Sequence, residues 1–142
     1  MRLGDHTHHA CLVVDGLVGR FGQSATGLRQ ISAIHVPGDM VDLHSVVAST
    51  ASSALSALSP ATILRVPHAA IRERADIYPR LARAFWRDCV IDAAVLAETI
   101  LTIGRRSGIA RVAHLLCELA IRFALIGWGE GLIFELNLTQ PH

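Results

Sequence analysis

The chain has 142 residues, enough for one domain with a hydrophobic core. Hydrophobic residues make up 51% of it but aromatic residues only 5%, so alanine, leucine, isoleucine and valine must form that core. The formal net charge is +1, and no basic patch is dense enough to predict non-specific binding to a polyanion.

The cysteines and the apolar segments indicate the cellular compartment. Cys11, Cys89 and Cys117 lie far apart and form no CxxC pair, which argues against a disulfide framework and fits a reducing cytoplasm. The N-terminal residues lack the apolar run of a signal peptide. The most apolar segment, residues 109–128, carries too many ionisable groups for a membrane span. We therefore expect a cytoplasmic protein with no membrane partner.

The first half of the chain is predicted to form short strands. Residues 11–14 and 17–21 are rich in β-formers and flank Asp15-Gly16, a dipeptide typical of hairpins. Residues 28–36 alternate imperfectly, as a strand does, and Pro37-Gly38-Asp39 then predicts a turn.

Two more short strands are predicted before the helical half. Residues 45–53 are small and polar and predict a loop, and residues 54–58 and 62–66 predict strands on either side of Ser59-Pro60. Several short strands at this spacing favour an antiparallel roll or barrel.

The apolar period then changes to that of helices. Pro67-His68 opens a short helix, and Asp76 is predicted to cap a long helix that has Pro79 in its first turn. Residues 104–108 interrupt the helical pattern, and residues 109–123 resume it. Residues 132–138 predict a last strand.

The long helix carries two apolar stripes. The first runs through Phe85, Cys89, Ala93, Leu96, Ile100 and Ile103, and the second through Ala84, Ile91, Val95 and Thr102. Two stripes need two partners, and one small roll covers only one of them. We therefore predict a homodimer with Ala84, Ile91, Val95 and Thr102 at its interface; packing within one chain is the alternative.

Catalytic and metal-site patterns are weak. His35, His44 and His68 fall in the roll, but no HxH pair and no suitably spaced glutamate accompanies them, so we predict no metal site. The chain has no GxSxG motif and no glycine-rich phosphate loop, and we predict no enzyme. For Asp39 we expect a turn-stabilising role, with backbone N–H groups after Gly38 as donors.

Several segments, in order, resemble the Crp–Fnr regulators. In the roll they are Gly27-Leu28-Arg29-Gln30-Ile31, His35-Val36-Pro37-Gly38-Asp39 and Asp42-Leu43; later ones are Tyr78-Pro79-Arg80-Leu81-Ala82-Arg83, residues 111–119 and Leu138-Thr139-Gln140. That family comprises homodimeric bacterial transcription factors with a cyclic-nucleotide-binding-like sensor, a dimer helix and a winged helix-turn-helix.

The resemblance implies an α+β fold in three parts. Residues 1–77 would form the sensor, an antiparallel β-roll of the cyclic-nucleotide-binding-like, double-stranded β-helix type. Residues 78–104 would form the dimerisation helix, and residues 105–142 the incomplete start of a winged-helix domain, without its recognition helix. On this interpretation DNA binding belongs to full-length relatives, and the chain alone would not bind specific DNA.

The resemblance also places a ligand pocket at Gly38, Asp39, Leu43, Ser52 and Ser53. Members that bind cyclic AMP hold its ribose with a Gly-Glu pair and its phosphate with an arginine. Here Gly38-Asp39 stands where those members have the Gly-Glu pair. No arginine lies between Arg29 and Arg65 to hold the phosphate. We predict that cyclic nucleotides bind weakly or not at all. Another small molecule, whose identity the sequence does not indicate, could still be the effector. No cofactor is identified, and Cys11 alone does not supply the cysteine cluster of the iron–sulfur members.

The sequence thus predicts the sensor and dimerisation part of a Crp–Fnr-type regulator. Two alternatives stay open: a small cupin-like metal-binding protein or enzyme, and a stand-alone dimerisation partner of full-length paralogues.

Overall fold

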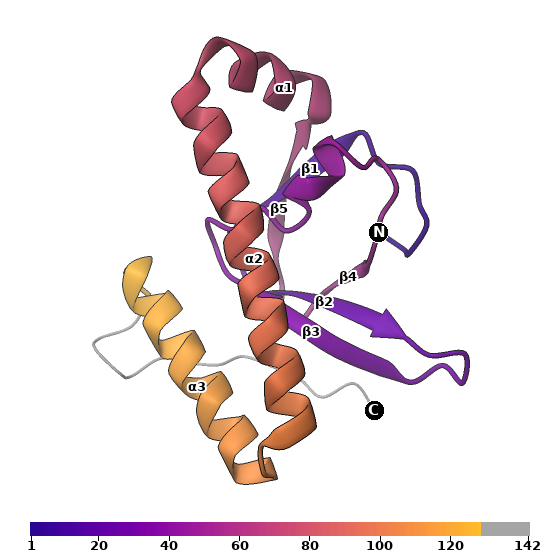
Figure 1. Cartoon of the computed structure of the whole chain (residues 1–142), viewed down its shortest axis with the longest axis vertical. Coiled ribbons are helices and arrows are strands. Elements are labelled where there is room, and N and C mark those ends of the chain that lie inside the picture. Colours follow the sequence, from indigo (N-terminus) through magenta and orange to yellow (C-terminus); the bar gives the residue numbers. More distant parts are fainter. Residues whose placement is uncertain (129–142) are drawn as a thin grey trace.

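A computed structural model describes residues 1–128 of the chain. A β-roll occupies the first half and three helices follow it, so the predicted α+β class and antiparallel roll are confirmed (Figure 1). The last predicted strand, at residues 132–138, and the segment Leu138-Thr139-Gln140 lie outside the described residues.

The roll is built from two antiparallel sheets. In the first, β1 (His9–Asp15) pairs with β5 (Thr62–Pro67). In the second, β2 (Val18–Gln23) lies between β3 (Arg29–His35) and β4 (Ala54–Ala57). The five strands predicted at residues 11–14, 17–21, 28–36, 54–58 and 62–66 are therefore present, with shifted ends.

The hairpin predicted at Asp15-Gly16 was wrong, because β1 and β2 belong to different sheets. One edge of β1 pairs with β5. The other edge forms hydrogen bonds with the turn at Gly38, whose backbone N–H donates to the Val13 carbonyl. Gly16 has a φ of +77° and lies so close to Pro60 that a Cβ atom would be 2.1 Å from the Pro60 carbonyl oxygen. This glycine turns the chain from one sheet to the other.

The turn at Pro37-Gly38-Asp39 is confirmed, with a φ of +94° at Gly38 and a bond from the Asp39 N–H to the Val36 carbonyl. After it, Leu43–Val46 forms the 3₁₀ helix η1, where the sequence predicted a loop from residue 45. Ser45 is buried there and bonds to His68, which explains why a polar stretch is ordered.

Three helices complete the described chain: α1 (His68–Ile77), α2 (Pro79–Arg105) and α3 (Gly108–Leu125). The predicted cap at Asp76 was wrong. Asp76 lies in the last turn of α1, and α2 begins after Tyr78, which makes no side-chain cap bond. Pro79 stands in the first turn as predicted, since its missing N–H has no partner to lose there.

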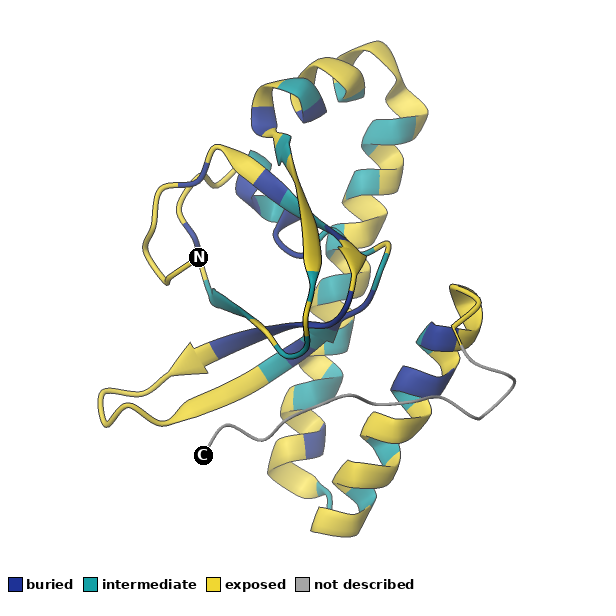
Figure 2. Cartoon of the chain, turned by 180° about the vertical axis from the view of Figure 1, so that it is seen from behind, coloured by how far each residue is buried: buried dark blue, intermediate teal, exposed yellow. Residues whose placement is uncertain are grey.

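The core divides into three clusters, and two of them join the roll to the helices (Figure 2). In one, Ala10, Leu43 and Ile71 pack with Phe85 and Cys89 of α2. In another, Leu17 and Val36 of the roll pack with Leu119 and Phe123 of α3. The third is wholly within the roll and contains Val13, Val18 and Val41.

Candidate functional site

Part of the exposed surface of α2 is apolar. Thr102 is the one residue of this helix that is buried. Trp86, Val90 and Ile100 are 69%, 68% and 66% exposed, which is unusual for side chains of this size. With the exposed Ala93 and Ala97 they recur at steps of four, three, four and three, the pattern of a helix–helix seam. We call Trp86, Val90, Ala93, Ala97 and Ile100 the outer stripe.

The four residues predicted at the dimer interface do not share this stripe. Ala84 and Ile91 are exposed, Val95 is half-buried, and Thr102 is only 8% exposed within a single chain. Asp92, which lies between Ile91 and Val95 in the sequence, faces the roll and binds Arg20. The assignment of the four residues to an interface remains a prediction.

The five residues predicted to line a ligand pocket are dispersed. Ser52 and Ser53 line an open groove of about 860 Å³ between the N-terminal segment, the β2–β3 hairpin and β4. Leu43 is buried in the core with Ala10 and Ile71. Asp39 lies on another side of the roll, against α3, and Gly38 forms the turn beside it.

The groove at Ser52 and Ser53 has cationic side chains that sequence reasoning did not assign to it. Arg2 and Arg29 line it, and none of its described lining residues is acidic. The Arg29 guanidinium lies 4.8 Å from the centre of the Phe21 ring, a cation–π contact. Arg29 reaches the groove because residues 21–23 of β2 pair with residues 29–31 of β3. The pairing holds the part of the hairpin next to its turn at the groove.

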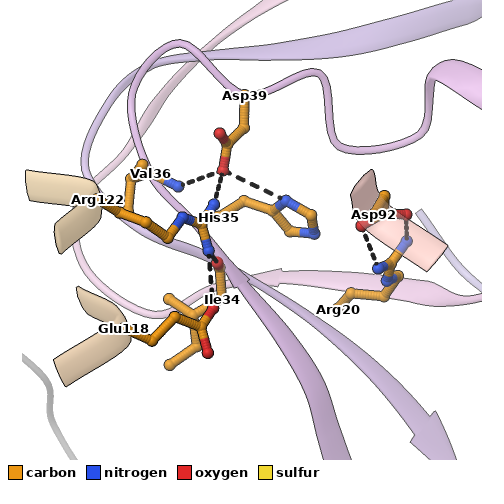
Figure 3. Close-up of polar contacts among 8 residues, drawn as sticks. All are labelled: Arg20, Ile34, His35, Val36, Asp39, Asp92, Glu118 and Arg122. Atoms are coloured by element: carbon orange, nitrogen blue, oxygen red, sulfur yellow. Dashed lines mark hydrogen bonds and ion pairs between the residues drawn. The ribbon is translucent and has the colours of Figure 1, made fainter. Parts of the chain in front are cut away.

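A buried ion pair fastens α2 to the roll (Figure 3). Arg20 of β2 is 5% exposed, and its Nη1 and Nη2 atoms each lie 2.6 Å from a carboxylate oxygen of Asp92. Two parallel charge-assisted bonds satisfy both groups, which offsets the cost of removing them from water. No local pattern indicates this pair, because its members are 72 positions apart.

Arg122 fastens α3 to the roll in a similar way. Its guanidinium donates to the Ile34 carbonyl at 2.6 Å and to the carboxylates of Asp39 and Glu118. Asp39 also accepts the Val36 N–H at 2.9 Å, so its turn-stabilising role is observed, although this donor precedes Gly38 rather than following it. Figure 3 draws Asp39 with Val36, His35 and Arg122 around it.

These contacts decide the charge state of Asp39. Burial opposes ionisation, but the hydrogen bond from His35, the charge of Arg122 and the bond from the Val36 N–H outweigh it and lower the pKa of the Asp39 carboxyl. Asp39 is therefore held as a carboxylate in the folded protein.

The three histidines of the roll do not converge on one point. His35 lies beside Asp39, with Nδ1 at 3.5 Å from Oδ2, while His44 bonds to Ser52 and His68 to Ser45. Burial lowers the pKa of His68 and favours its neutral form. Within residues 1–128, no three histidine, cysteine or acidic side chains are placed to hold a metal ion. The same residues include no helix that is both long and apolar enough to cross a membrane.

Comparisons with known proteins agree on one group. No protein-family model matches the chain. The anaerobic regulatory protein of Haemophilus influenzae is 23% identical over 139 residues, which is 98% of this chain and 54% of that protein. The transcriptional activator protein Anr of Pseudomonas protegens is 24% identical over 98% of this chain and 57% of its own length. The chain thus spans about half the length of the curated relatives it matches.

Solved structures share the fold. FixK2 from Bradyrhizobium japonicum superposes with a TM-score of 0.78 at 26% identity, over 85% of this chain and 60% of that one. A CRP-family transcriptional regulator from Thermus thermophilus gives a TM-score of 0.68 over 84% and 58%, and its 15% identity supports the fold alone. In sequence and in fold together, the chain corresponds to the sensor region of a Crp–Fnr-type regulator.

Proposed function

We propose that the chain is the sensor and dimerisation part of a cytoplasmic, DNA-binding transcription regulator of the Crp–Fnr type. The observation that carries the proposal is the sequence match along 98% of the chain, which runs through the roll and all three helices. In this proposal, DNA contact belongs to full-length regulators of this type, and one relative is named as a transcriptional activator. The cupin-like alternative receives no support, because these relatives are regulators rather than metal enzymes.

The outer stripe of α2 supports dimerisation. A helix that leaves a row of large apolar side chains in water gains stability when a second copy covers them. The two-fold axis would then run along α2, where each residue of the stripe meets its counterpart. Sedimentation equilibrium at tens of micromolar should give the mass of a dimer. A monomer at that concentration would contradict the proposal.

Cyclic nucleotides are not the effector in this proposal. Residues 30–64 hold no arginine, and Arg20, which is buried nearby, is bound to Asp92. A cyclic phosphate placed beside Ser52 and Ser53 would have only Arg2 and Arg29 as possible cationic partners, and Arg29 already stacks on the Phe21 ring. Calorimetric titration with cyclic AMP and cyclic GMP should give no binding in the low micromolar range. Tight binding that Arg29→Gln abolishes would contradict this and assign the phosphate to the groove.

A further inference from the structure

A cleft lies where the roll, α2 and α3 meet, and it is separate from the groove at Ser52 and Ser53. Its volume is about 350 Å³, within the range of small-molecule sites. We call it the junction cleft. Most of the wall surface is apolar, and the lining side chains include His35, Asp88, Ile91, Val95, Ile121 and Leu125.

The acidic groups of the junction cleft are paired with one exception. Asp92 is bound by Arg20, and Asp39 and Glu118 are bound by Arg122. Asp88 of α2 has no hydrogen-bond or ion-pair partner within residues 1–128. Burial, together with the nearby charges of Asp39 and Asp92, raises the pKa of its carboxyl, and His35 acts in the opposite direction. A cation beside Asp88 would relieve this repulsion.

Asp88 is exposed to solvent, whereas His35 supplies a buried group without a partner. It is 5% exposed, and its Nε2 atom has no hydrogen-bond partner in the described part of the chain. Its Nδ1 atom faces the Asp39 carboxylate, which favours the tautomer with hydrogen on Nδ1. In the neutral ring with this tautomer, Nε2 presents a lone pair at the cleft wall and needs a donor, because an unpaired buried acceptor is costly.

We propose that the junction cleft binds a small molecule that carries an ammonium group on an apolar body. The ammonium N–H groups would donate to His35 Nε2 and to the Asp88 carboxylate, while Ile91, Val95, Ile121 and Leu125 surround the apolar part. A bare metal ion fits less well, since no three potential ligands within residues 1–128 converge. Because the walls come from β3, α2 and α3, an occupant would bridge the sensor and both helices.

The test compares matched probes on the whole chain. Calorimetric titration should show saturable binding of cyclohexylamine and binding at least tenfold weaker for neutral cyclohexanol, a difference of about 1.4 kcal/mol. Amide shifts in an NMR titration should gather at residues 33–40, 88–95 and 118–125. Asp88→Asn should weaken amine binding at least fivefold and leave cyclohexanol unaffected.

Two further variants separate charge from shape. Glu73→Gln removes the same charge from an exposed site on α1 and should leave amine affinity unchanged. Val95→Phe fills the cleft without a change of charge and should weaken both probes. Equal affinity for amine and alcohol, or an undiminished affinity in Asp88→Asn, would overturn the proposal. Such a failure would not affect the proposed regulator function, which is tested by the dimer mass and by cyclic-nucleotide titration.

Discussion

The β-roll and the helices use their apolar side chains differently. The roll buries Ala10, Val13, Val18 and Val41 almost completely. In α2 and α3 many large apolar residues are exposed, although Leu119 and Phe123 are buried, and most of both helices is coloured as exposed or intermediate in Figure 2. On α3, Ile109 and Leu125 are even more exposed than Trp86 on α2. The roll therefore has a complete core within one chain, while the helices have apolar surface that a further partner would cover.

The largest effect is expected from a charge in the outer stripe. Val90→Asp would place two carboxylates against each other in an apolar seam of the dimer, at a cost of several kcal/mol per buried charge. The dimer dissociation constant should rise at least about a hundredfold. Sedimentation equilibrium measures it directly.

A matched variant on the roll controls for the added charge. Leu28→Asp makes the same change at a residue that is 75% exposed near the tip of the β2–β3 hairpin. It should leave the dimer intact. If Leu28→Asp dissociates the dimer and Val90→Asp does not, the contrast between roll and helix would be reversed.

The next largest effect is expected from weakening the contact between α3 and the roll. Leu119 is fully buried between α3 and the roll, and Leu119→Ala should lower the free energy of unfolding by about 3 kcal/mol. Leu116→Ala, on the exposed side of the same helix, should cost less than about 1 kcal/mol. Urea denaturation of both variants measures the difference. Equal costs would show that α3 does not pack on the roll in solution.

The buried ion pair tests how α2 is held. Arg20→Met leaves Asp92 unpaired and should destabilise the protein by about 2–3 kcal/mol. The double variant Arg20→Met/Asp92→Leu should recover part of that loss, since no charge is then left alone. Arg106→Met removes a more exposed pair with Glu98 and should cost less than about 1 kcal/mol. A double variant less stable than Arg20→Met would contradict the coupling.

The smallest expected effect depends on pH. The folded protein lowers the pKa of Asp39 below its ordinary value of 3.8, so ionised Asp39 adds stability above that value and the gain is lost as pH falls through the folded pKa. Asp39→Asn should therefore cost about 1 kcal/mol at pH 7. The difference from the wild type should shrink toward acid. Denaturation at several pH values measures it, and a pH-independent difference would be inconsistent with this account.

Local signals predicted most elements correctly. The turn at Pro37-Gly38-Asp39 and the start of α2 at Pro79 follow from the backbone restrictions of proline and glycine, which act wherever these residues stand. A turn dipeptide also led to the wrong prediction of a hairpin at Asp15-Gly16. A dipeptide can specify a turn but not which strand will pair with the next, and here both edges of β1 were taken by distant segments.

The candidate sites were harder to predict than the elements. Ser52 and Ser53 do line a groove, but Asp39 and Leu43 lie elsewhere because the roll closes between them. The sequence pattern did not indicate that Asp92 of α2 faces the roll, where it is half-buried against Arg20. Pairing between distant charges leaves no periodic trace that a single sequence would display.

The sequence by itself determined the α+β order of elements, the long helix with more apolar residues than one contact face needs, and the resemblance to Crp–Fnr sensors. Hydrophobic period, turn chemistry and composition act over a few residues and can therefore be read from the sequence. Only the tertiary structure decided which strands pair, which face of α2 remains open and how His35 and Asp88 come to share a cleft with α3. These features depend on contacts between residues tens of positions apart, whose geometry is set when the whole chain closes on its core.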